Sequence, residues 1–348
     1  PASISGATMR PFLTAGAGLW LAERRASGRT TLSVSGDGGR TWASRLDYDG
    51  GLPTQVLVDA GGAGVVVAGQ RDRGIADLVV FHTDDGGASW RRLAPPISAE
   101  AWGVPYFTDA SRGWVLASLG PASAEVLATR DGGRTWSAAP PFNDRANFPG
   151  LSSVALRVLW TDDGRGVAVP PVGTGTTRPH VVVTDDGGIT WRASFPAVPT
   201  GQDVTAADTM LDAGIGPDGR GTLFLRPAGA RSGGVRALFA YATVDAGRTW
   251  ARPVRVAGPA AGDAQVLFAL DDQHWWAASG SGADLLASAD GGRTTRRYGG
   301  LLPAGYAFQS IGFRTAGDGW AVATAGGRTA VMLTHDGGAT WRAAGLPG

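Results

Sequence analysis

The fold is decided by one stretch of eight residues, Ser35-Gly36-Asp37-Gly38-Gly39-Arg40-Thr41-Trp42, because close copies of it return along the whole chain. Six further boxes of this kind begin at Thr83, Thr129, Thr184, Thr243, Ser288 and Thr334. The fifth box has Ala246 at its first Gly position, and the sixth ends in Thr295 in place of Trp. The boxes recur about every 50 residues, which is the period of β-propeller blades.

Each box predicts a tight turn. Two successive Gly residues can adopt positive φ at little steric cost. The carboxylate of the Asp and the hydroxyls of the Ser and Thr residues can form local hydrogen bonds that stabilise the turn. We therefore assign a structural role to seven aspartates, Asp37, Asp85, Asp131, Asp186, Asp245, Asp290 and Asp336.

A second repeat precedes each box. Its clearest copies run from Phe107 to Ala117 and from Phe313 to Ala323, each with a Gly-Trp pair that opens a strand. Each unit then contains strand, turn, strand, loop, strand, box and strand. The sequence predicts an all-β protein, a single seven-bladed β-propeller with four antiparallel strands per blade. The predicted blades span about 1–50, 51–97, 98–142, 143–199, 200–257, 258–302 and 303–348.

Composition agrees with this fold and excludes several chemistries. The 348 residues include 55 Gly, 13 Trp and 11 Phe, so turns are abundant and a large core can form. All basic side chains apart from His are Arg, and the net charge is +1 with no long basic run, which argues against nucleic-acid binding. The absence of Lys and Cys excludes Schiff-base, P-loop and thiolate chemistry. No apolar stretch is long enough to span a bilayer, and we expect no cofactor and no metal.

The boxes resemble the Asp-box repeats of bacterial neuraminidases, and the longer unit most resembles the photosystem II stability/assembly factor-like propellers. The resemblance covers essentially the whole chain. It implies the propeller fold but does not identify an activity, because catalytic and non-catalytic proteins share such boxes. It also implies an exported bacterial protein, in the extracellular space or the cell envelope, although no signal-peptide pattern is present in this chain.

A sialidase-like enzyme is the main catalytic alternative. Met9 to Phe12 resembles the segment that places an arginine on the substrate carboxylate in sialidases, and Tyr306 lies roughly where that family keeps its nucleophile. However, no Asp precedes Asp37 and no Glu follows Glu125, so the partner carboxylates are missing unless an Asp substitutes. Other glycosidases need two carboxylates at a defined separation, and no Asp pair is singled out by its spacing.

One set of positions is chemically suggestive. When the blades are aligned on the Gly-Trp strand, the first strand of successive blades carries equivalent residues, Arg10, Gln55, Val104, Arg157, Asp212, Val266 and Ser310. Arginines in this register would favour an anionic or carboxylate-bearing ligand in a central channel. Alternatively, these arginines form structural ion pairs or bond main-chain carbonyls.

The connections between blades provide the second candidate surface. Scaffold-mounted loops commonly carry function. The longest connections, 137–153 and 193–205, lie around the fourth repeat, and the loop 170–180 should lie on the same face. They form either a binding surface or tolerated insertions. Together, the two surfaces give these candidate ligand-binding residues: Arg10, Gln55, Trp102, Tyr106, Asp144, Arg145, Arg157, Arg178, His180, Asp212 and Tyr306.

We interpret the chain as a non-catalytic recognition or assembly module. It would bind a protein partner or a carbohydrate on the inter-blade loop face, and we expect a monomer. The alternative is a glycoside hydrolase in which Arg10 and Arg157 hold a sugar carboxylate. The N-terminal segment has two possible places, since residues 1–8 can join either the first strand of blade one or the last blade.

Overall fold

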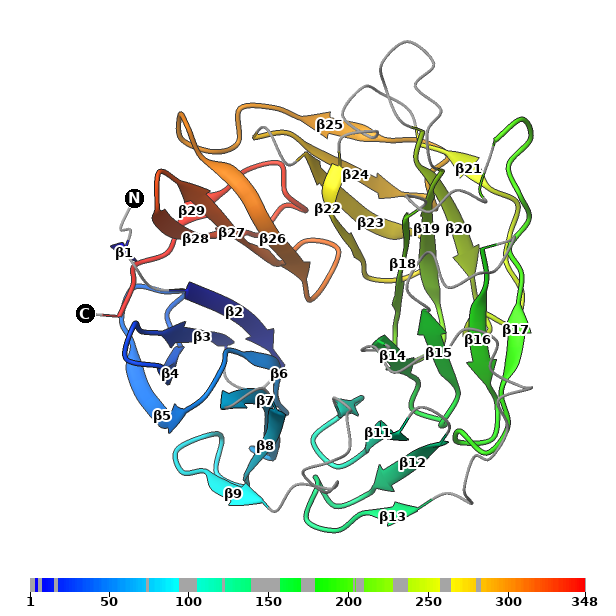
Figure 1. The fold of residues 1–348 in the computed structure, drawn as a ribbon. Coiled ribbons are helices and arrows are strands. Elements are labelled where there is room, and N and C mark those ends of the chain that lie inside the picture. The colour runs from blue at the N-terminus through cyan, green and yellow to red at the C-terminus, as the bar shows by residue number, and fades with distance from the viewer. Residues whose placement is uncertain are drawn as a thin grey trace. The chain divides into compact units, whose positions relative to one another are not determined.

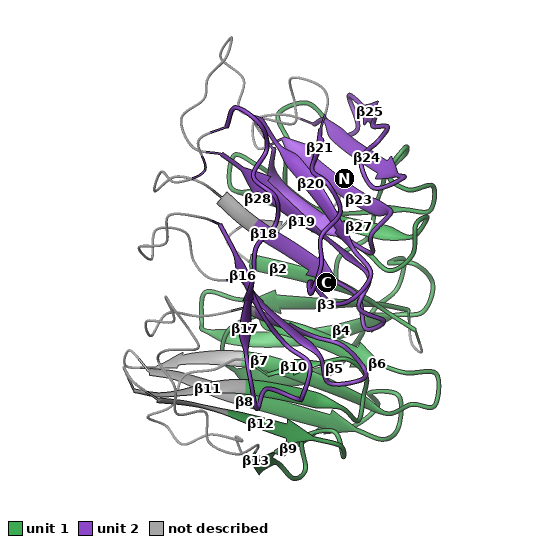
Figure 2. Cartoon of the chain, turned by 90° about the vertical axis from the view of Figure 1, so that its right-hand side faces the viewer, with its two compact units in different colours: residues 1–119, 125–138, 302–348 green, residues 120–124, 139–301 purple. Residues whose placement is uncertain are grey.

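The computed structural model describes residues 4–5, 8–15, 18–72, 75–93, 105–120, 123–138, 157–169, 179–202, 204, 210–227, 237–256, 264–279 and 283–347. The fold is a seven-bladed β-propeller with four antiparallel strands per blade (Figure 1). No helix occurs in these described ranges. Figure 2 shows the two compact units into which the chain divides, residues 1–119, 125–138 and 302–348 in one and residues 120–124 and 139–301 in the other.

The first unit holds blades 1, 2 and 7 and most of blade 3. Blade 1 contains β2 (Thr8–Thr14), β3 (Gly18–Arg24), β4 (Arg29–Ser35) and β5 (Ala43–Asp49). Blade 2 contains β6 (Pro53–Val58), β7 (Gly64–Asp72), β8 (Ile75–Thr83) and β9 (Arg91–Leu93), and blade 3 contains β10 (Tyr106–Phe107), β11 (Gly113–Gly120), β12 (Ser123–Thr129) and β13 (Ser137–Ala138). Blade 7 contains β26 (Ala307–Phe313), β27 (Gly319–Ala325), β28 (Arg328–Thr334) and β29 (Arg342–Ala343).

The second unit holds blades 4, 5 and 6. Blade 4 contains β14 (Arg157–Trp160), β15 (Gly166–Val169), β16 (Val181–Thr184) and β17 (Arg192–Ser194). Blade 5 contains β18 (Met210–Ile215), β19 (Gly221–Arg226), β20 (Phe239–Thr243) and β21 (Val254–Arg255). Blade 6 contains β22 (Ala264–Ala269), β23 (His274–Ser279), β24 (Leu285–Ala289) and β25 (Arg296–Tyr298).

The two ends of the chain meet in blade 7. The short N-terminal strand β1 (Ile4–Ser5) pairs with Arg328 and Thr329 of β28, and β29 pairs with Met332 and Leu333 of the same strand. Thr8 meanwhile begins the first strand of blade 1. Both places considered for the N-terminal segment are therefore used. Every other strand lies within the residue range predicted for its blade, whereas the prediction of a single domain stays a prediction.

Each box forms the same hydrogen-bonded turn. The first hydroxyl of the box donates to the Asp carboxylate over 2.7 to 3.0 Å in all seven blades. The second hydroxyl of the box donates to the other carboxylate oxygen over 2.6 to 2.7 Å. The Gly pair takes positive φ wherever it is present, and Ala246, at the position that lacks its Gly, has a φ of 56°. Ala246 is the one residue other than Gly with positive φ in the described ranges.

Within each unit, the core lies between the faces of neighbouring blades. Between blades 1 and 2, Trp20, Ala22 and Leu32 pack against Val66 and Phe81. These residues alternate along their strands with residues that point to the opposite face, as the period of two in a strand requires. Six Trp residues serve this core: Trp20, Trp160 and Trp275 are fully buried, and Trp90, Trp191 and Trp341 stack edge-on against neighbouring rings. They are therefore packing residues and not an exposed stacking platform.

Candidate functional site

The inner strands of the blades carry the suggestive positions in one equivalent register. Arg10 pairs with Ala22, and Gln55 pairs with Val67. Ala22 and Val67 each lie three residues after the residue that pairs with the first residue of the box, so the two pairs are equivalent in their sheets. Arg157, Asp212, Val266 and Ser310 occupy it in blades 4 to 7, and residue 104 lies outside the described residues.

Arg10 turns toward blade 2. Its Nη1 donates to the main-chain oxygen of Pro53 over 2.9 Å, while the side chain stays exposed over part of its surface. Partial burial lowers the pKa of its guanidinium. Within the described residues, no carboxylate forms an ion pair with Arg10, so its positive charge is partly desolvated and uncompensated.

Arg24 lies beside Arg10 on the same face of blade 1. Thr8 pairs with Arg24, and Thr8 and Arg10 are two residues apart, so both arginines project from one face of the sheet. Arg24 Nε donates to the main-chain oxygen of Gly50 over 3.2 Å. Arg24 also has no carboxylate partner among the described side chains, so the two charges adjoin without compensation.

The connector from Gly50 to Pro53 lies between these arginines and blade 2. Each of three carbonyl groups in it accepts a side-chain hydrogen bond: Gly50 from Arg24 and Thr30, Gly51 from Tyr48, and Pro53 from Arg10. The connector joins the outer strand of one blade to the inner strand of the next, so it lies on the inter-blade loop face. Because its carbonyls are held in place, Arg10 and Arg24 are presented on a pre-organised surface.

Three other arginines of the chain contrast with this pair, because each has a carboxylate partner. Arg134 makes two hydrogen bonds of 2.8 and 2.6 Å to Asp84, and Arg220 makes two of 2.7 and 2.9 Å to Asp272. Arg29 donates to Asp47 over 2.6 Å. These guanidinium groups are partnered within the fold, which suits a structural role, whereas Arg10 and Arg24 can still accept an external anion.

Gln55 is engaged with blade 3. Its Nε2 donates to the main-chain oxygen of Phe107 over 2.6 Å, and the Phe107 N–H donates to Gln55 Oε1 over 2.8 Å. Tyr106 precedes Phe107 and is half-buried. Arg10, Gln55 and Tyr106 thus follow one another along the inner strands of three consecutive blades. Gln55 links two blades, so we do not place it in the candidate site.

The remaining predicted residues lie elsewhere. In the second unit, Asp212 is half-buried and accepts from the N–H of Ala213 over 2.8 Å, and buried His180 lies with its ring 5.6 Å from that of Phe195. Tyr306 is half-buried in the turn before β26. The backbone of Arg157 lies in β14, but its side chain is outside the described part. Trp102, Asp144, Arg145 and Arg178, with most of the long loops, also lie outside the described residues.

The described carboxyls act as acceptors of hydrogen bonds. A hydrogen bond from the side chain of Ser89 and further bonds from the same turn lower the pKa of Asp85 to about 2. A hydrogen bond from Arg134 lowers the pKa of Asp84 to about 2. Every resolved carboxyl shift in the described ranges is downward, whereas a general acid of a glycosidase needs a raised pKa. The same ranges contain no cluster of three potential metal-ligating side chains and no helix long and apolar enough to span a membrane.

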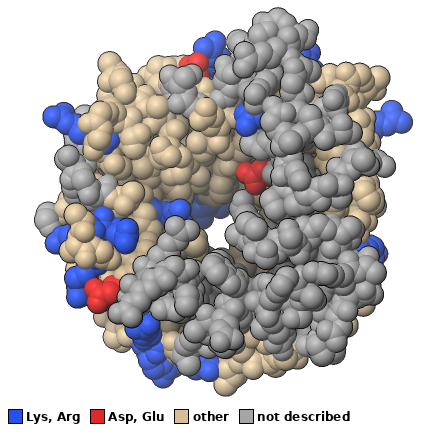
Figure 3. All heavy atoms as spheres, in the orientation of Figure 1, with Lys and Arg blue, Asp and Glu red and all other residues tan. Residues whose placement is uncertain are grey.

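Charge is dispersed on the face drawn in Figure 3. The arginine side chains of the described residues stand there at several separate places, and acidic side chains are fewer. Arg24 is not among the residues predicted from the sequence, because the predicted register covers only the first strand of each blade and Arg24 lies in the second. The signal that could have identified it is the pairing of β2 with β3, which sets Arg24 opposite Thr8 and beside Arg10.

Comparison with known proteins supports the fold. No protein-family model matches the chain, and no curated protein matches it. The solved structure of YCF48 from Cyanidioschyzon merolae is similar with a TM-score of 0.61 and 18% identity over 97% of each chain. YCF48 bound to D1 peptide is similar with a TM-score of 0.58 and 20% identity over 96% of each chain. A polysaccharide lyase, the PL25 ulvan lyase, is similar with a TM-score of 0.57 and 12% identity over 98% of each chain. At these identities the likeness shows the fold alone.

Proposed function

We propose that this chain is an exported, non-catalytic recognition module that binds an acidic segment of a protein partner on the inter-blade loop face of blades 1 and 2. Arg10 and Arg24 would anchor carboxylates of that segment. The observation that carries the proposal is the partly desolvated guanidinium of Arg10, which has no carboxylate partner within the described residues.

The chemistry of the site favours a carboxylate ligand. An arginine presents N–H donors in a planar fork that matches a carboxylate, and such bonds are stronger than neutral ones. Arg10 uses one N–H group on Pro53, and Arg24 uses its Nε on Gly50, so donors remain on both side chains. A second carboxylate nearby on the ligand would compensate the second arginine.

Structural likeness supports a peptide as the ligand. One similar structure is described as YCF48 bound to D1 peptide, so a propeller of this type can bind a peptide. A similar fold also occurs in a polysaccharide lyase. Since every resolved shift of a carboxyl pKa in the described residues is downward, we favour peptide recognition over glycan cleavage.

The test is a binding measurement with defined probes. Fluorescence anisotropy of an array of short acidic peptides, each with a free C-terminal carboxylate, should identify binders whose affinity falls with added salt. Arg10→Gln should weaken the best binder about tenfold or more, and Arg10→Gln with Arg24→Gln should weaken it further.

The matched control is Arg130→Gln, which removes an exposed arginine at a box turn of blade 3. It should leave the affinity unchanged. Equal losses in Arg130→Gln and Arg10→Gln would contradict the proposal, as would binding that is insensitive to all three substitutions.

A further inference from the structure

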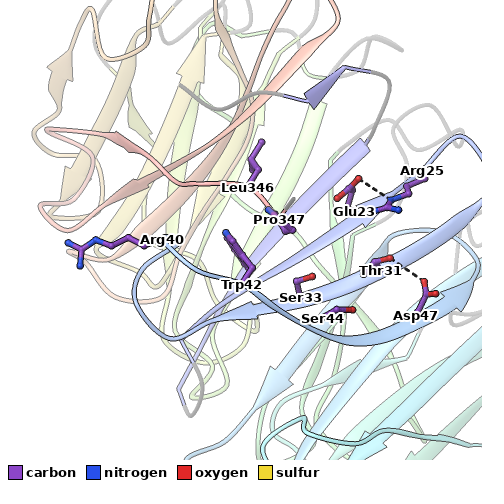
Figure 4. Close-up of a pocket in the computed structure, with 10 residues that line it drawn as sticks. All are labelled: Glu23, Arg25, Thr31, Ser33, Arg40, Trp42, Ser44, Asp47, Leu346 and Pro347. Carbon is purple, nitrogen blue, oxygen red and sulfur yellow. Dashed lines mark hydrogen bonds and ion pairs between the residues drawn. The ribbon is translucent and has the colours of Figure 1, made fainter.

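A second site lies on the other face of blade 1. Side chains from β3, β4, β5 and the turns beside them line an open pocket of about 520 Å³, together with the C-terminal residues Leu346 and Pro347 (Figure 4). This volume lies within the range of small-ligand sites, roughly 300–1,000 Å³. The strand β5 makes room for it, because β5 spans seven residues where the other outer strands span two or three.

The floor of this pocket is more polar than the equivalent positions of the other blades. Ser33 pairs with Leu21 in blade 1. The residues two positions before the box in the other six blades are Phe81, Leu127, Val182, Tyr241, Leu286 and Met332. Likewise, Glu23 occupies the register held by Ala68, Leu225 and Ala323 in blades 2, 5 and 7 and by Ser279 in blade 6. In these blades the fold forms without a charged side chain in this register, and blade 1 differs from them by its carboxylate.

Glu23 is an unusual residue for a propeller core. Its side chain is 9% exposed and lies toward the pocket, and its ion pair with Arg25, at 3.4 Å, is longer than a hydrogen bond (Figure 4). A buried carboxylate without close partners is costly. The hydroxyls of Ser33 and Ser44, which pair across β4 and β5, form no side-chain hydrogen bond with any described residue. The floor thus holds donors and acceptors in excess of what the described fold uses.

An apolar wall faces this polar floor. Trp42 Nε1 donates to the main-chain oxygen of Gly345 over 2.9 Å, which fixes the indole beside the C-terminal segment. Leu346 and Pro347 complete the wall. The two carboxylates that line the pocket are compensated, since Glu23 forms an ion pair with Arg25 and Asp47 is bonded by Arg29 outside the pocket, whereas the Arg40 side chain extends away from the other lining residues (Figure 4).

We propose that this pocket binds a neutral, hydroxyl-rich ligand, namely one or two hexose units of a glycan. Each sugar hydroxyl both donates and accepts, which suits a floor of carboxylates, hydroxyls and guanidinium groups. The C–H face of a sugar ring suits the wall of Trp42, Leu346 and Pro347. A cationic or anionic ligand would leave one sign of charge in the pocket uncompensated. This site is distinct from the proposed peptide site, which lies on the opposite face of blade 1.

The experiment uses the full chain and a panel of neutral disaccharides: maltose, cellobiose, lactose and diacetylchitobiose. Saturation-transfer-difference NMR should detect at least one of them, with putrescine and glucuronate as charged comparisons, and calorimetry should give its affinity. Glu23→Gln, which keeps the shape of the side chain, should weaken binding at least tenfold. Ser33→Leu, which restores the hydrocarbon of the other blades, should abolish binding.

Controls separate binding from folding and from the peptide site. The midpoint of denaturant unfolding of Ser33→Leu should be unchanged or higher, and if this variant unfolds, Ser44→Leu at the exposed edge should block the pocket instead. Arg10→Gln should bind the disaccharide like the wild type. The proposal is overturned if no disaccharide binds at millimolar concentration, if only putrescine or glucuronate binds, or if binding survives both Glu23→Gln and blockage of the pocket.

Discussion

The charged side chains of the seven box turns and those at the loop end of blade 1 differ in how far their hydrogen-bonding groups are used within the fold. In every box turn, the Asp carboxylate accepts hydrogen bonds from two hydroxyls and from main-chain N–H groups. At the loop end of blade 1, Arg10 and Arg24 each donate one hydrogen bond to a main-chain oxygen and have no carboxylate partner in the described residues. Charged groups whose hydrogen-bonding partners lie within the fold stabilise the scaffold, whereas arginines without a carboxylate partner are available to bind a ligand.

Acid should lower the free energy of unfolding by protonating the aspartates of all the box turns, and this is the largest effect expected. The folded-state pKa is about 2 for Asp84, Asp85 and Asp131 and is also lowered for the remaining box aspartates, against about 3.9 in an unfolded chain. The unfolded chain therefore binds more protons between these values, so stability is full above about pH 5 and falls as the pH is lowered through about 4 toward 2. Urea unfolding followed from about pH 7 to about pH 2 checks this. A free energy of unfolding that stays constant over that window would contradict it.

Removing one box carboxylate should have the next largest effect. Asp186→Ala leaves Thr184 and Thr190 without their acceptor and should lower the free energy of unfolding by about 3 kcal/mol. Asp186→Asn keeps one oxygen acceptor and should lose less. Asp49→Ala, at an exposed carboxylate, is the control for denaturant unfolding, and equal losses in Asp49→Ala and Asp186→Ala would break the comparison.

Gln55 distinguishes a structural link from a binding residue. Gln55→Ala removes both hydrogen bonds to Phe107 and should cost about 2 kcal/mol, because the main-chain groups of Phe107 lose their partners. Arg10→Gln should cost less than about 1 kcal/mol, since the side chain is exposed and makes one hydrogen bond. Thermal and urea unfolding of both variants test this order. The reverse order would assign Arg10 to the scaffold.

A substitution in the box of blade 5, which has Ala246 in place of Gly, should change the free energy of unfolding least. Ala246 adopts a φ of 56°, which is strained for a residue with a Cβ. Ala246→Gly should raise the free energy of unfolding by about 0.5–1 kcal/mol after the loss of one buried methyl group. The matched reverse change is Gly187→Ala, where φ is 76° and an added Cβ meets no neighbour. It should lower the free energy of unfolding by about 1 kcal/mol, and a stabilising Gly187→Ala would contradict the strain.

The fold was predictable because the box repeat carries its own chemistry. The Asp, the Gly pair and the hydroxyls predict a turn, and the Gly-Trp strand predicts the register that brings Arg10, Gln55 and Asp212 to equivalent positions. The place of Ile4 and Ser5 in blade 7 was less predictable, because pairing between distant segments depends on the whole fold.

The candidate site was predictable in part. Arg10 stood out by its register, but which main-chain oxygen it bonds depends on how blade 2 approaches, so the pairing with Arg24 and the role of Gln55 were not evident. The polar floor of the pocket had a signal in the sequence. Ser33 stands where five of the other blades carry an apolar residue and blade 5 carries Tyr241, and only a comparison aligned on the boxes shows this.

The most direct test of the central claim is hydrogen–deuterium exchange of the chain with and without its best acidic peptide. The account predicts added protection from exchange in fragments that cover the turn 25–28, which follows Arg24, and the connector 50–53, to which Arg10 and Arg24 donate. It predicts no change in the box turns. Arg10→Gln with Arg24→Gln should remove that protection at the same peptide concentration. Protection confined to the box turns, or protection of the connectors that persists in the double variant, would contradict the claim that uncompensated charge on blade 1 is the recognition surface.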